Sequence, residues 1–223
     1  MKSAGTSIEY AIALRYPLTN DDICTGNTNL NSLYGDWAKN MENHPKMNYG
    51  KAEHWGPQHL HSYFPFINLD LYKKYCIVRN PWDTMVSYYW YIHELHSRYS
   101  FDPECEPLPT DDFGIIKVKF NTWMKKQFIT RIFKDDRPPW EFPYETVSRV
   151  NEPMVEYADK ILRFENLVED TKSVLDIEFT LPRFKSGTKR LSNHYRDYYI
   201  DQGLIDSIAK SFPNTIKLGN YNF

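Results

Sequence analysis

Residues 71–95, LYKKYCIVRNPWDTMVSYYWYIHEL, contain the pattern that decides the fold. The short apolar run at 75–78 is typical of a strand that is buried on both faces of a sheet. After the RNP turn, apolar residues recur at helical spacing: Met85, Tyr88, Ile92 and Leu95. The stretch therefore predicts a strand, a tight turn and a helix with one apolar face.

The turn between these two elements carries its own helix-start signals. Asn80 can cap the helix, and Pro81 fits the first helical position because it has no N–H to lose. The negative charge of Asp83 suits the positive end of the helix dipole.

Further elements follow along the chain. A second buried strand is expected at 161–164, followed by a helix that runs through residue 175. A helical pattern covers 118–133, and a loop covers 98–114. A final helix places four residues on one face: Leu204, Ile205, Ile208 and Phe212. Strands that alternate with helices predict an α/β fold with a parallel sheet flanked by helices.

Length and composition favour one globular domain over the whole chain, 1–223. Hydrophobic residues make up 41% and charged residues 25%, which excludes wholesale disorder. With 27 basic and 29 acidic residues the net charge is −2, so we expect no nucleic-acid partner. The aromatic content of 16% is enough to line both a core and a ligand cleft.

The cysteine spacing and the hydropathy of the chain bear on metal binding, on the thiol state and on location. The three cysteines, at 24, 76 and 105, form no CxxC pair, and HELH at 93–96 is one residue short of the HExxH zinc motif. We therefore expect reduced thiols and no metal. No apolar run approaches 18 residues, so no membrane segment is expected and a cytoplasmic location is predicted.

The N-terminus offers a first candidate anion site. A run of small residues precedes a predicted helix, and its backbone N–H groups can point at a phosphate or sulfate: Ser3, Ala4, Gly5, Thr6 and Ser7. Lys2 adds a full positive charge. An ordinary capped helix is an equally good interpretation, and the Walker A pattern is absent.

Arg79 marks a second candidate. It ends the first predicted strand, at the carboxyl edge of the sheet where open α/β folds bind ligands, and Ser87 lies on the helix that follows. A structural ion pair is the commoner role of such an arginine.

These two segments together carry a family resemblance. KSAGTSIE resembles the 5′-phosphosulfate loop, and YCIVRNPWDTMVSYYW the 3′-phosphate segment, of sulfotransferases that use 3′-phosphoadenosine-5′-phosphosulfate (PAPS). The likeness is to the carbohydrate branch, and RFENL, NHYRDYY and LGNYNF add to it. The resemblance implies a P-loop-like sheet and sulfuryl transfer from PAPS, without a metal, to a hydroxyl acceptor such as a glycan.

The resemblance also implies roles for individual residues. Lys2 and residues 3–7 would hold the 5′-phosphosulfate, and Arg79 and Ser87 the 3′-phosphate. The basic loop FKSGTKR resembles a segment that closes over the nucleotide, which makes Lys185, Lys189 and Arg190 candidates. A solvated charged loop is the alternative, and it is slightly favoured.

An acceptor hydroxyl needs a base, and a histidine suits that role. His59 in GPQHLHSYFPF matches the Pro-x-His base of carbohydrate-type relatives, and His61 is second. Three tryptophans could form the base of a sugar-binding site: Trp55, Trp123 and Trp140. Burial in the core is the more common fate of tryptophan.

One feature departs from the family pattern. Relatives place a hydrophobic strand before the first lysine, whereas here only Met1 precedes Lys2. We expect either a start upstream, which could carry an anchor and a Golgi location, or a sheet completed differently. A non-catalytic binding relative and a nucleotide kinase or NTPase remain the alternative functions.

Overall fold

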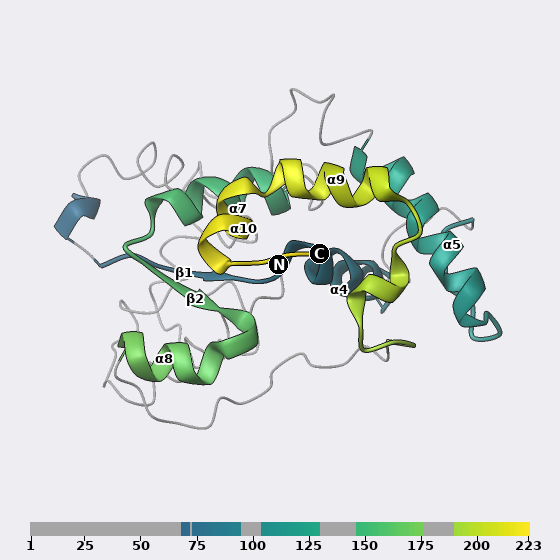
Figure 1. The fold of residues 1–223 in the computed structure, drawn as a ribbon, viewed down its shortest axis with the longest axis horizontal. Helices are drawn as coiled ribbons and strands as arrows, with labels where there is room; N and C mark the ends of the chain where they lie inside the picture. The colour runs from purple at the N-terminus through teal and green to yellow at the C-terminus, as the bar shows by residue number, and fades with distance from the viewer. Residues whose placement is uncertain (1–67, 72, 95–103, 130–145, 176–189) are drawn as a thin grey trace, which may run out of the picture. The chain divides into compact units, whose positions relative to one another are not determined.

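A computed structural model describes residues 68–71, 73–94, 104–129, 146–175 and 190–223 (Figure 1). The described residues belong to two compact units. One unit comprises the described parts of 78–156 together with 190–223, and the other comprises 68–77 and 157–175. The expectation of a single domain over the whole chain stays a prediction.

The smaller unit is built around two parallel strands. β1 (Tyr75–Val78) pairs with β2 (Lys160–Arg163), and the 3₁₀ turn η3 (Leu69–Leu71) precedes β1. The backbone N–H groups of Asp159 and Lys160 both donate to the Lys74 carbonyl oxygen, at 2.9 and 3.2 Å. The predicted strands at 75–78 and 161–164 are thus confirmed, the second shifted by one residue.

The side chains of β1 alternate instead of being buried throughout. Cys76 and Val78 are buried, whereas Tyr75 is 39% exposed and Ile77 is intermediate. The expectation of burial on both faces is therefore wrong for this strand. A small apolar cluster supports the sheet, and its members come from both strands and from α8 (Leu167–Leu175): Ile77, Leu162, Leu167 and Leu175.

The larger unit begins where β1 turns into α4 (Pro81–Glu94). The Asn80 side-chain oxygen accepts from the N–H groups of Trp82 and Asp83 at 3.1 and 3.2 Å. Asn80 therefore caps the helix, with Pro81 as its first residue, as predicted. Of the predicted core face of α4, Met85 is fully buried and Tyr88 packs against the core, whereas the Ile92 side chain and Leu95 lie outside the described part. Three further buried side chains of α4 join this face: Trp82, Val86 and Tyr89.

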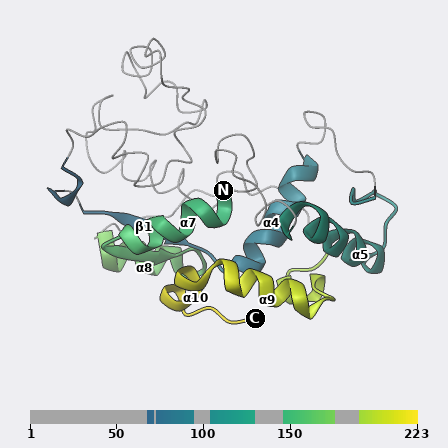
Figure 2. The ribbon, with the colours of Figure 1, turned by 90° about the horizontal axis from the view of Figure 1, so that it is seen from above.

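An aromatic core holds this unit together. α4 packs with α5 (Phe113–Trp123), the π-helical turn η5 (Met124–Ile129), the 3₁₀ turn η8 (Tyr195–Tyr198) and α9 (Gln202–Ser211). Tyr89 of α4 meets Phe120 of α5 edge to face, with ring centroids 5.4 Å apart, and Figure 2 shows these helices side by side. Trp123 is only 2% exposed, so it belongs to the core.

The last helix is capped by a carboxylate from another helix of the same unit. α10 (Pro213–Gly219) follows α9 directly (Figure 1), and Glu152 of α7 (Thr146–Tyr157) accepts from two of its first N–H groups. The Asn214 N–H lies 2.7 Å and the Thr215 N–H 3.1 Å from the Glu152 oxygens. A side chain from another helix thus caps α10.

The described residues form a mostly helical structure with one small parallel sheet, which is compatible with the α/β class. The predicted helix through residue 175 and the final helix are confirmed as α8 and α9, and all four predicted residues of the latter face are buried. The predicted helical stretch at 118–133 is confirmed as far as residue 129, but the helix already begins at Phe113, within the loop predicted over 98–114. Within the described ranges, no helix combines the length and the apolar character that crossing a membrane requires.

Candidate functional site

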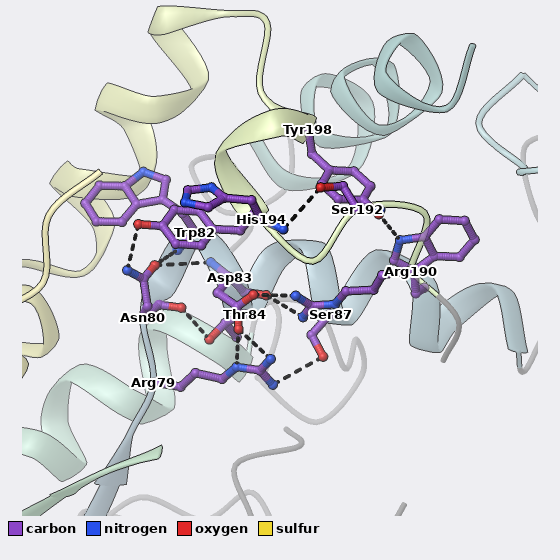
Figure 3. A network of polar contacts seen from close by, with 12 residues as sticks. Arg79, Asn80, Trp82, Asp83, Thr84, Ser87, Arg190, Ser192, His194 and Tyr198 are labelled. Carbon is purple, nitrogen blue, oxygen red and sulfur yellow. Dashed lines mark hydrogen bonds and ion pairs between the residues drawn. The ribbon is translucent and has the colours of Figure 1, made fainter. Parts of the chain in front are cut away.

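Three of the predicted anion-binding residues meet in the larger unit. Arg79 and Arg190 both contact the carboxylate of Asp83, and Ser87 contacts Arg79. These four residues together are called the strand-end cluster (Figure 3). Arg190 lies 107 residues beyond Asp83 in the chain. The fold therefore brings the basic loop residue to the end of the first strand.

Local spacing explains how the first three side chains come together. Asp83 and Ser87 lie four residues apart on one face of α4, and Arg79 lies four residues before Asp83, just ahead of the capping residue Asn80. The Arg79 Nε and Nη2 atoms lie 2.7 and 2.5 Å from Asp83 Oδ2. The Arg79 Nη1 atom donates to the Ser87 hydroxyl at 3.2 Å. The expectation that Arg79 could serve as an ion-pair partner is thus confirmed.

Arg190 takes the other oxygen of the same carboxylate. Its Nη1 atom lies 2.5 Å from Asp83 Oδ1, and its Nη2 atom donates to the Asp83 carbonyl oxygen at 3.3 Å. The side chains of Arg79, Asp83 and Arg190 are 11%, 17% and 17% exposed. For Arg190, the alternative of a solvated loop residue is therefore wrong, because its guanidinium is largely withdrawn from water.

A second set of hydrogen bonds holds the Arg190 segment against α4. The Tyr198 hydroxyl, on a fully buried ring, accepts from Trp90 Nε1 and from the Ser192 N–H, both at 3.2 Å (Figure 3). The Ser192 hydroxyl in turn donates to Asp197 at 2.6 Å and accepts from the His194 N–H at 3.1 Å. The backbone two residues beyond Arg190 is thereby attached to the aromatic core.

The turn that presents Arg79 is fixed from the C-terminal side. The Asn80 amide donates to the Tyr195 hydroxyl at 3.2 Å, and that hydroxyl donates to the Asn222 carbonyl at 2.9 Å. Trp82 Nε1 donates to the Ile205 carbonyl at 3.1 Å. The start of α4 is therefore tied to both the α9 helix and the chain's last residues, which limits its movement.

The strand-end cluster carries excess positive charge. Two arginines against one aspartate leave a formal charge of +1 within the cluster. Burial of the Asp83 carboxyl raises its pKa, but the Arg79 charge and the hydrogen bond and charge of Arg190 outweigh this and leave the pKa below its ordinary value. The carboxylate is thus ionised at neutral pH, and the net charge stays at +1.

Such an arrangement suits an anion with several oxygens. Guanidinium groups offer planar forks of N–H donors that match phosphate or sulfate geometry, and a serine hydroxyl can donate as well. Arginines that are mostly shielded from water interact more strongly with an anion than solvated ones do.

Several predicted site residues lie outside the described residues, and they stay predictions. These are the first-loop residues Lys2, Ser3, Ala4, Gly5, Thr6 and Ser7, the histidines His59 and His61, the lysines Lys185 and Lys189, and the tryptophans Trp55 and Trp140. In the part of the chain that the structure covers, no three His, Cys, Asp or Glu side chains gather as a metal site would require.

Sequence reasoning missed the central member of the cluster. Asp83 was assigned only to the helix dipole, although its position four residues after Arg79 is a recognisable ion-pair signal. No local pattern could indicate the contact with Arg190, since it depends on the tertiary fold.

Comparisons of the chain with models of known protein families, with curated proteins and with solved structures found no match.

Proposed function

We propose that this chain transfers a sulfuryl group from PAPS to a hydroxyl acceptor, a carbohydrate, on a P-loop-like parallel sheet. The strand-end cluster would hold the 3′-phosphate of the donor nucleotide, and the loop at Lys2 to Ser7 its 5′-phosphosulfate.

One observation carries the proposal. The sequence resemblance assigns nucleotide contacts to Arg79, Ser87 and Arg190, and in the structure Arg79 and Arg190 both bind the Asp83 carboxylate while the Ser87 hydroxyl accepts from Arg79. Two of them lie near each other in the chain, but the third is more than a hundred residues away. This convergence is what a common anion would require.

The charge of the cluster supports a phosphate monoester as its guest. A monoester carries nearly two negative charges at neutral pH, and the cluster has a formal charge of +1 before any ligand binds. The position at the end of β1 and the start of α4 also suits an anion, because the helix N-terminus adds a partial positive charge.

The proposed reaction needs two further groups. As the acceptor oxygen forms its bond to sulfur, the bond from sulfur to the bridging phosphate oxygen breaks, and charge develops on that oxygen. In the proposal Lys2 neutralises this charge, and His59 takes the proton of the acceptor hydroxyl. Arginine, lysine and backbone N–H groups can stabilise such charges without a metal ion.

Two measurements test the function. In a transfer assay with ³⁵S-labelled PAPS and a panel of glycan acceptors, we expect label on a glycan hydroxyl. The His59→Ala variant should bind adenosine 3′,5′-bisphosphate with unchanged affinity by calorimetry but transfer roughly 10²- to 10⁴-fold more slowly, as expected for loss of a general base. Equal transfer by His59→Ala would remove His59 from the mechanism.

The alternative functions give different outcomes in the same experiments. Nucleotide binding without transfer to any acceptor would favour a non-catalytic binding relative. Magnesium-dependent hydrolysis of ATP, with no preference for a 3′-phosphate, would favour a kinase or NTPase and would contradict the proposal.

A further inference from the structure

We infer that Asp83 is a positioning residue, which aligns the guanidinium groups of Arg79 and Arg190 so that one 3′-phosphate can engage both. The inference rests on the proposed function and deepens it, since it assigns a role to the one acidic residue in the strand-end cluster. Without the carboxylate, two arginines would face each other at close range within a partly buried site.

The geometry of the carboxylate carries the inference. Asp83 Oδ2 accepts from Nε and Nη2 of Arg79, while Oδ1 accepts from Nη1 of Arg190. Each oxygen therefore fixes a different guanidinium. A single planar carboxylate thus determines the mutual orientation of two planar cations.

The backbone of the same residue strengthens this arrangement. The Asp83 carbonyl oxygen accepts from Arg190 Nη2 at 3.3 Å, so Arg190 has both of its terminal nitrogens on Asp83. Because Asp83 lies in the first turn of α4, which Asn80 caps, this anchor is itself rigid. Arg190 is therefore held to α4 mainly through one residue.

A counter-ion in an anion site could instead compete with the ligand. Competition is disfavoured here because both oxygens of the Asp83 carboxylate already accept from guanidinium groups, one from Arg79 and the other from Arg190. Alignment lowers the entropic cost of fixing two long side chains when the ligand binds. The orienting effect of Asp83 should therefore outweigh its repulsion of the phosphate.

The test is a set of calorimetric titrations of the full chain. Two probes are used, adenosine 3′,5′-bisphosphate and adenosine 5′-monophosphate, which differ only at the 3′ position. We expect Asp83→Asn to weaken the binding of the bisphosphate by about tenfold. This value lies within the range of coupling energies between residues in one ion-pair network. The monophosphate should bind the variant and the wild type equally.

A double-mutant cycle shows whether Asp83 acts through Arg190. In an Arg190→Ala background the Asp83→Asn effect should shrink, because one of the two guanidiniums that Asp83 aligns is gone. Asp83→Glu keeps the charge and should restore part of the lost affinity. Asp170→Asn, which removes the carboxylate beside a different arginine, is the matched control and should change neither titration.

Each other outcome overturns the inference. Tighter or unchanged bisphosphate binding by Asp83→Asn would make the carboxylate a competitor or a bystander. Equal weakening of the binding of both nucleotides would make its role merely structural. If the wild type itself shows no preference for the bisphosphate, the proposed function fails, which is a result distinct from failure of the Asp83 assignment.

Discussion

Both strands of the small sheet end in an arginine that pairs with an aspartate on the helix that follows. At the end of β2, Arg163 places Nε and Nη2 at 3.1 and 3.0 Å from the two Asp170 oxygens. At the end of β1, Asp83 forms ion pairs with both Arg79 and Arg190. Asp170 thus contacts one arginine at its strand end, whereas Asp83 contacts two.

Exposure separates the two strand ends as well. The Arg163 side chain is 41% exposed, but those of Arg79 and Arg190 are 11% and 17% exposed. Water screens the first arginine and much less the other two. The two strand ends therefore differ both in the number of arginines on the carboxylate and in how far those arginines are shielded from water.

Separate removal of the arginine at each strand end should give the largest difference in nucleotide binding. Arg79→Ala should weaken the binding of adenosine 3′,5′-bisphosphate by at least about 30-fold. Truncation of a shielded, hydrogen-bonded charge costs about 2 kcal/mol or more of binding free energy. Asp83 keeps Arg190 as a partner, so the fold should survive. Arg163→Ala, titrated in parallel by calorimetry, should bind as the wild type does, and a comparable loss there would erase the distinction between the two ends.

Removal of the two aspartates should differ in stability. Asp83→Ala leaves two shielded guanidiniums without their shared carboxylate, so we expect a loss of about 3 kcal/mol in the free energy of unfolding. Asp170→Ala, beside a more exposed arginine, should cost about 1 kcal/mol or less. Urea titrations followed by circular dichroism measure both. Equal losses would show that the cluster is no more shielded than the pair.

Acidification should remove the contribution of Asp83 to the stability of the folded protein. Its pKa lies below the ordinary value in the folded protein, so the stability it adds is present above the unfolded pKa and is lost as pH falls through the folded pKa. The stability advantage of the wild type over Asp83→Asn should thus be constant from about pH 5 to 7 and shrink below about pH 4. Urea midpoints across this range test it. An advantage that grew on acidification would contradict the sign.

Removal of the cap should have the smallest effect. Asn80→Ala deletes the side chain that caps α4, at a cost of about 1 kcal/mol in unfolding free energy. At the other strand end, the residue before η7 (Phe164–Asn166) is Arg163, and it makes no side-chain cap. Arg163→Ala should therefore change the thermal midpoint less than Asn80→Ala does, and the reverse order would show that the β1 turn is held by other contacts.

Sequence reasoning succeeded where local rules suffice. Asn80 and Pro81 start α4 through contacts within three residues, and Leu204 and Ile208 mark the buried face of α9 by spacing alone. It missed α7, where Pro153 lies inside the helix, and it missed the part of the α4 core face that Trp82, Val86 and Tyr89 form. That face is set by distant partners, since Trp82 donates to the Ile205 carbonyl and packs edge to face on Phe223.

The candidate site shows the same division. Arg79 and Ser87 follow from a strand end and helical spacing, and the sequence suggested both. Arg190 was suggested by resemblance alone, and its approach to Asp83 depends on how Tyr198 anchors the segment that follows it. Tertiary packing of this kind has no signature within a short window of sequence.

The central claim is that the strand-end cluster binds the 3′-phosphate of a nucleotide, and the wild-type protein alone can test it. Calorimetry should show that adenosine 3′,5′-bisphosphate binds at least about 30-fold more tightly than adenosine 5′-monophosphate, as expected for a phosphate held by two shielded arginines. Equal affinities for the two nucleotides would contradict the claim.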